Sequence, residues 1–66
     1  MIKVEKLLGV IAENRKTQKD VADAIGVSDK TFYLKMKKGV FGSDEIDKMI
    51  QYLHIEHPEE IFLVKE

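Results

Sequence analysis

Residues 17–32 read TQKDVADAIGVSDKTF, and this stretch decides the fold class of the chain. Thr17 and Asp20 have the spacing of a capping box, in which each side chain accepts a hydrogen bond from the other residue's backbone N–H. An apolar stripe follows, formed by Val21, Ala22 and Ile25. The helix is expected to end at Gly26, because glycine adopts the positive φ of a helix C-terminus without the steric penalty of a Cβ.

A second helix is predicted almost at once, since only Gly26 and Val27 precede Ser28, a good N-cap residue. It is expected to run over about residues 29–38. Two short helices joined by so brief a turn cannot lie antiparallel, so they are predicted to cross steeply, as in a helix-turn-helix. Four residues are expected to hold this arrangement: Ala22 where the helices press together, Gly26 in the turn, and Val27 and Phe32 in the core.

Two further amphipathic helices are predicted on either side of this pair. Apolar residues recur at i, i+3, i+4 and i+7 in two places, at Val4, Leu7, Leu8 and Ile11, and at Ile46, Met49, Ile50 and Leu53. The first pattern predicts a helix over about residues 3–14, with Gly9 tolerated because another element approaches it closely. Ser43 is expected to cap the second.

The end of the chain predicts a short final turn over residues 59–63, with Pro58 at the N1 position. Ile61 and Phe62 are expected to close the core. Leu63 and Val64 are left open between core and a homodimer contact. With 66 residues and no repeat or linker, the chain is predicted to be one domain, 1–66, all-α and a compact bundle of about five helices.

From Thr17 to about Gly39 the sequence resembles the helix-turn-helix of the phage repressor and Cro family, with Gln18, Ala22, Gly26, Val27 and Phe32 in matching places. The whole chain resembles the short Cro-like regulators of phages of Gram-positive bacteria, whose fold is the lambda repressor-like DNA-binding domain. The resemblance implies that Gln18 bonds a phosphate. It also implies that base edges are faced by Asp29, Lys30, Thr31 and Leu34.

The chemistry of the third helix is consistent with those roles. Lys30 can donate to guanine, Asp29 can accept from cytosine, and Leu34 can touch a thymine methyl, while Tyr33 lies on the same exposed face. Asp29 has the alternative of stabilising the start of its own helix. Phosphate contacts are expected from Gln18, Ser28, Lys35, Lys37 and Lys38, although the three lysines also suit a solvated helix C-terminus.

The net charge of −1 over the whole chain argues at first against a nucleic-acid partner. Residues 15–38, however, hold seven basic and three acidic side chains, a net charge of +4, whereas residues 39–66 hold two basic and seven acidic ones, a net charge of −5. Such asymmetry suggests that one face meets a polyanion. The basic part coincides with the predicted helix-turn-helix.

Several function classes find no support in the sequence. The absence of cysteine removes thiolate chemistry and agrees with a cytoplasmic protein, and the apolar runs are too short for a membrane span or a signal peptide. His54, Glu56 and His57 suggest a metal site only superficially, because Pro58 interrupts their context. No enzyme activity, cofactor or metal is predicted.

Two functions of different classes therefore remain. The first is a sequence-specific transcriptional regulator that binds a double-stranded DNA operator through residues 29–38, as a monomer or a homodimer. The second is a protein-interaction module that binds another regulator through its acidic C-terminal half.

Overall fold

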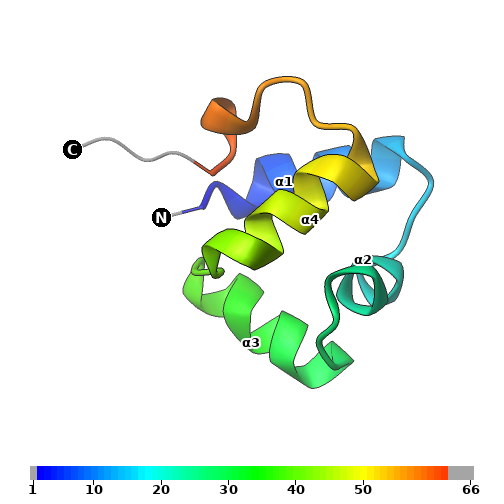
Figure 1. The fold of residues 1–66 in the computed structure, drawn as a ribbon, viewed down its shortest axis with the longest axis vertical. Coiled ribbons are helices and arrows are strands. Elements are labelled where there is room, and N and C mark those ends of the chain that lie inside the picture. Colours follow the sequence, from blue (N-terminus) through cyan, green and yellow to red (C-terminus); the bar gives the residue numbers. More distant parts are fainter. Residues whose placement is uncertain (1, 63–66) are drawn as a thin grey trace.

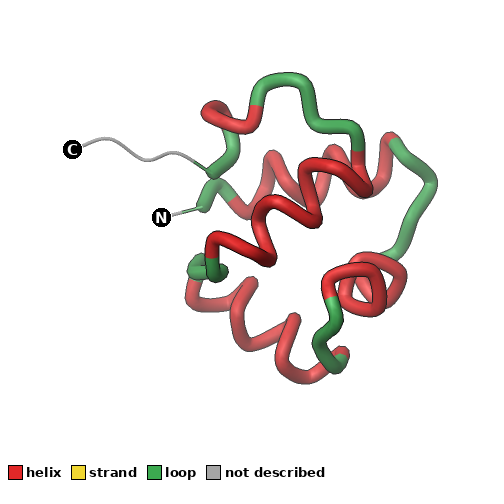
Figure 2. The backbone as a smooth tube through the Cα atoms, viewed as in Figure 1, coloured by secondary structure: helices red, strands yellow, loops and turns green. Residues whose placement is uncertain are grey.

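The computed structural model describes residues 2–62, and within them the chain is all-helical, with no strand (Figures 1 and 2). The four α-helices are α1 (Val4–Glu13), α2 (Gln18–Ile25), α3 (Asp29–Lys38) and α4 (Ser43–Leu53). In Figure 1 α4 runs across the middle of the molecule in front of α1, with α3 below them and α2 seen nearly end-on. Among the described helices, none combines the length and the apolar character that crossing a membrane requires.

The predicted final turn is present, but it is not a fifth α-helix. The chain forms a single 3₁₀ turn there, Pro58–Glu60, with proline at its first position as predicted. The turn closes when the N–H of Ile61 donates to the carbonyl oxygen of Pro58, and Ile61 then enters the core with only 4% of its surface exposed. The N–H of Phe62 also donates to the carbonyl oxygen of Pro58, at 2.8 Å. Leu63 and Val64, left open between the core and a homodimer contact, lie outside the described part of the chain.

The predicted capping box of α2 is confirmed. The Thr17 hydroxyl accepts from the Asp20 backbone N–H at 3.1 Å, and the Asp20 carboxylate accepts from the Thr17 N–H at 2.8 Å. At the other end Gly26 takes the left-handed conformation, with φ of 82°. Both ends of α2 are therefore set by residues next to it in sequence.

The predicted ends of α3 are confirmed as well. The Ser28 hydroxyl accepts from the Thr31 N–H at 3.1 Å, and Gly39 ends the helix with φ of 71°. The predicted cap of α4 is off by one residue, because Gly42 is the N-cap and Ser43 already belongs to the helix. There the Glu45 carboxylate accepts from the Gly42 N–H at 2.8 Å, which satisfies a free backbone donor without a hydroxyl.

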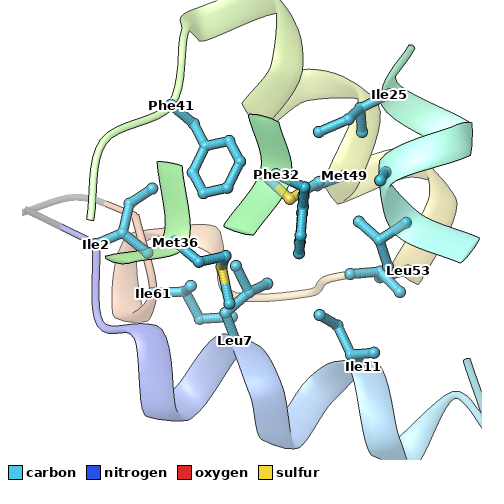
Figure 3. Packing of buried hydrophobic residues seen from close by; sticks show 12 residues of the cluster. Ile2, Leu7, Ile11, Ile25, Phe32, Met36, Phe41, Met49, Leu53 and Ile61 are labelled. Carbon is cyan, nitrogen blue, oxygen red and sulfur yellow. The ribbon is translucent and has the colours of Figure 1, made fainter. Parts of the chain in front are cut away.

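The core gathers side chains from all four helices (Figure 3). Its largest fully buried side chains are those of Leu7, Val21, Phe32, Met49 and Leu53. Ala22 is fully buried in α2, and Val27 is half-buried against the same cluster, as the sequence predicted. Figure 1 shows α2 and α3 crossing steeply, so the short turn has the predicted consequence.

Two buried residues were not predicted to be core from the sequence: Ile2 was not assigned, and Phe41 was assigned to a loop. Ile2 and Phe41 are 8% and 7% exposed, and the Phe41 ring packs against Phe32 with centroids 5.5 Å apart. Main-chain bonds hold the N-terminal residues in place: the N–H of Ile2 donates to Gly39 O, and that of Lys3 to Ile61 O. Ile61 itself was predicted to be core, and it is.

Two expectations for α1 are wrong. Leu8, predicted to lie on its buried face, is 37% exposed, because Leu7 and Ile11 already fill the contact with the core. Gly9 has no close neighbour, since a Cβ added there meets nothing within 4 Å. The glycine in α1 is therefore not explained by packing.

Candidate nucleic-acid interface

One side of α3 is anchored in the core and the other is open. Phe32 and Met36, one helical turn apart, are 2% and 6% exposed. The opposite side carries five exposed side chains, called here the outer face of α3: Lys30, Tyr33, Leu34, Lys37 and Lys38. Tyr33 and Leu34 keep 60% and 45% of their surface exposed, so this face combines positive charge with apolar contact area.

The first turn of α3 lies against the first turn of α2. The Lys19 ammonium is 3.6 Å from the Asp29 carboxylate, and both side chains remain more than half exposed. An ion pair as exposed as this contributes little stability, because water and salt screen it. Gln18, the residue before Lys19, is also exposed.

The hydroxyls at the start of α3 bond each other. Ser28 donates through its hydroxyl to Thr31 Oγ1 at 3.0 Å, while its oxygen accepts from the Thr31 N–H. Thr31 is half-buried and Ser28 exposed. The Thr31 hydroxyl hydrogen is left to donate to another acceptor.

The three predicted phosphate-binding lysines of α3 differ in their surroundings. Lys35 is half-buried, and its ammonium donates to Glu45 Oε1 at 2.9 Å. Within residues 2–62, Lys37 and Lys38 have no carboxylate oxygen within 4.0 Å, and neither has Lys30. The structure therefore brings Lys30, Lys37 and Lys38 together as exposed cations and separates Lys35 from them.

Glu45 is a residue that sequence reasoning missed. The Gly42 backbone N–H is the main influence on its carboxyl and, together with the Lys35 ammonium, holds the pKa of Glu45 below its ordinary value of 4.5, against the opposing effect of burial. Its position at the third residue of α4 is a capping-box signal in the sequence. No local pattern could have placed Lys35 beside it, since the two residues are ten apart.

A groove of about 580 Å³ lies between α1 and the segment that follows α4. Its apolar part includes Gly9, Val10 and Leu53. Four ionised side chains also line it, three of them acidic: Lys6, Glu13, Glu56 and Glu60. No residue of α3 takes part, so the groove is separate from the outer face of α3.

The histidines do not assemble in the way the sequence suggested. Instead of His54 and Glu56, it is Glu59 and Glu60 that accompany His57, with ligand atoms within 4.8 Å of one another. All three are exposed, and His57 Nδ1 already lies 3.5 Å from the Glu59 carboxylate. Exposed acidic groups commonly gather like this without binding an ion, so this cluster carries no argument for a metal.

Comparisons with family models, with curated proteins and with solved structures each produced no match for this chain. What the protein does is therefore inferred from the surface of α3 and its surroundings.

Proposed function

We propose that this chain is a sequence-specific DNA-binding transcriptional regulator that performs no catalysis. In this proposal α2 and α3 form a helix-turn-helix, and α3 enters the major groove of a double-stranded operator. The observation that carries it is the outer face of α3, where Lys30, Lys37 and Lys38 are exposed and unpaired within the described residues while the other side of the helix is anchored by Phe32 and Met36.

Base recognition falls to the N-terminal half of this helix. Lys30 donates to guanine O6 and N7, and Leu34 contacts a thymine methyl. Asp29 and Thr31 lie nearer the turn, where Asp29 accepts from cytosine N4 once Lys19 releases it. Tyr33, 60% exposed, adds contact area at the edge of the groove.

Phosphate contacts are assigned to residues at the two ends of the helix pair. Gln18 and Ser28 lie at the starts of α2 and α3, and Lys37 and Lys38 at the end of α3. Such contacts orient the protein and provide affinity without reading sequence. The net charge of +4 over residues 15–38 supports this assignment.

The experiment is selection of bound duplexes from a random pool, followed by titration of the recovered operator with two variants. Lys30→Ala is expected to cost about 1–3 kcal/mol at one base-pair position. Lys38→Ala is expected to weaken binding to all duplexes equally. It should also reduce the salt dependence of the binding constant by about one released counterion. Half-sites about 10 bp apart in the recovered operator would indicate a symmetric dimer.

Lys6→Ala is the matched control, because it removes an exposed lysine from α1 and leaves the helix pair untouched. It should leave both operator preference and salt dependence unchanged. An unaltered preference in Lys30→Ala would show that α3 is not the reading helix.

A protein-interaction module is the second candidate, and the groove beside α1 favours it. Glu13, Glu56 and Glu60 surround an apolar floor there, a surface suited to a basic segment of another regulator. That function makes no use of the lysines of α3. Failure of the protein to bind heparin or any duplex at low salt would favour it over DNA binding.

A further inference from the structure

We propose that Lys35 and Glu45 form a positioning pair that holds the C-terminal half of α3 against the start of α4, and that Lys35 is not a phosphate ligand. The inference rests on the proposed function, in which α3 is the helix that reads DNA. It separates Lys35 from Lys37 and Lys38, which the sequence alone groups together.

A single oxygen atom joins three parts of the molecule. Glu45 Oε1 accepts from the Lys35 ammonium at 2.9 Å and from the Gly42 backbone N–H at 2.8 Å. Lys35 belongs to α3, Gly42 to the loop after it, and Glu45 to the first turn of α4. The pair therefore ties the end of one helix to the beginning of the next.

The burial of this pair distinguishes it from the other lysine–carboxylate pair near α3. The Lys35 and Glu45 side chains are 33% and 18% exposed, whereas those of Lys19 and Asp29 are 69% and 59% exposed. Screening by solvent and salt weakens the exposed pair much more than the sheltered one. The Lys35–Glu45 contact is thus the one that can maintain a fixed geometry.

The position of Lys35 on the helix agrees with this role. It lies three residues after Phe32 and directly before Met36, so it borders the anchored side of α3 and not the outer face. To reach a phosphate its ammonium would have to leave Glu45, and the sheltered carboxylate would then lose its cation.

The tilt of α3 matters because a base-reading side chain must be held in place to within a fraction of an ångström. Phe32 and Met36 anchor one side of the helix through apolar packing, which has no direction of its own. A charge-assisted hydrogen bond at Lys35, beside these two anchors, adds a directional constraint. Lys30 and Leu34 benefit from that constraint without touching Glu45.

The test uses the full chain and the operator recovered by selection, with dissociation constants measured at several salt concentrations and at a temperature where circular dichroism shows every variant folded. Lys35→Met removes the cation, and Glu45→Gln removes the charge but keeps an oxygen for the Gly42 N–H. Each single variant is expected to raise the dissociation constant for the operator about threefold to tenfold. The double variant should raise it no further than the more damaging single change does, because both changes break the same contact. Neither should reduce the salt dependence.

The controls separate positioning from charge. Lys38→Met, on the outer face, should reduce the salt dependence by about one counterion. Asp47→Asn removes an exposed carboxylate from α4 and reports the effect of net charge alone.

Opposite results would overturn the inference. If Lys35 contacts phosphate, Lys35→Met lowers the salt dependence as Lys38→Met does, and Glu45→Gln tightens binding more than Asp47→Asn because a competitor for Lys35 is gone. Unchanged operator binding in Lys35→Met would also refute it. If the unmodified protein binds no duplex, it is the proposed function itself that fails.

Discussion

The helix pair from Thr17 to Gly39 and the closure formed by Ile2, Phe41 and Ile61 are held in different ways. The helix pair is bounded by hydrogen bonds between residues three apart and by two glycines with positive φ. The closure joins residues from the beginning, middle and end of the chain. Local signals thus shape the surface proposed to bind DNA, while distant contacts hold the domain together.

The largest expected effect lies in the closure. Phe41→Ala should lower the free energy of unfolding by about 3–5 kcal/mol, because it removes a buried ring that packs on Phe32. A domain of this size rarely has more than about 3–5 kcal/mol in its core, so chemical denaturation should find the variant largely unfolded.

Two milder changes make this test specific. Phe41→Leu should retain most of the stability, at a cost below about 1.5 kcal/mol, and allows a denaturation curve to be measured. Val40→Ala, at an adjacent residue that is 59% exposed, should change stability by less than about 0.5 kcal/mol. Equal losses of stability in Val40→Ala and Phe41→Ala would contradict the role of Phe41 in the closure.

A smaller effect is expected in the helix pair. Thr17→Ala should cost about 1 kcal/mol, since it removes the hydroxyl that accepts from the Asp20 N–H. Ser43→Ala is the matched comparison: Ser43 has the sequence of a cap but lies inside α4, so thermal unfolding should detect little change. A comparable loss at Ser43 would mean that the start of α4 is wrongly placed.

A gain of stability is expected outside both regions. Gly9→Ala should raise the free energy of unfolding by up to about 1 kcal/mol, because a helical glycine is replaced where nothing lies within 4 Å of the new Cβ. Gly26→Ala should do the reverse, since φ there is 82°. A loss of stability in Gly9→Ala would show instead that another element packs closely against Gly9, as the sequence predicted.

The smallest effect is a pH dependence shared by two capping carboxylates. Backbone N–H groups of Thr17 and Gly42 lower the pKa of Asp20 and Glu45, respectively, below 3.8 and 4.5. As pH falls, the unfolded chain takes up these protons first, so both contributions are complete above the unfolded pKa values and are lost on acidification through the folded ones. Glu45→Gln should flatten the fall of stability below about pH 4.5 when chemical denaturation is followed at a series of pH values.

Much of the candidate site could be read from local chemistry. Ser28 and Gly39 bound α3 as predicted, and the spacing of Phe32 and Met36 identified its anchored side. The Lys35–Glu45 contact could not be predicted, because it depends on the angle between α3 and α4. The roles of Lys30 and Leu34 toward bases stay predictions until DNA binding is measured.

By itself the sequence determined the four α-helices, the caps of α2 and α3 and the basic segment, since each depends on residues within one or two turns of one another. Only the tertiary structure decided which apolar residues close the core, for Phe41 and Ile2 are buried while Leu8 is not. The tertiary structure also decided which lysine of α3 pairs with a carboxylate and which do not. Burial and ion pairing between distant residues depend on how helices pack, and helical periodicity carries no information about that geometry.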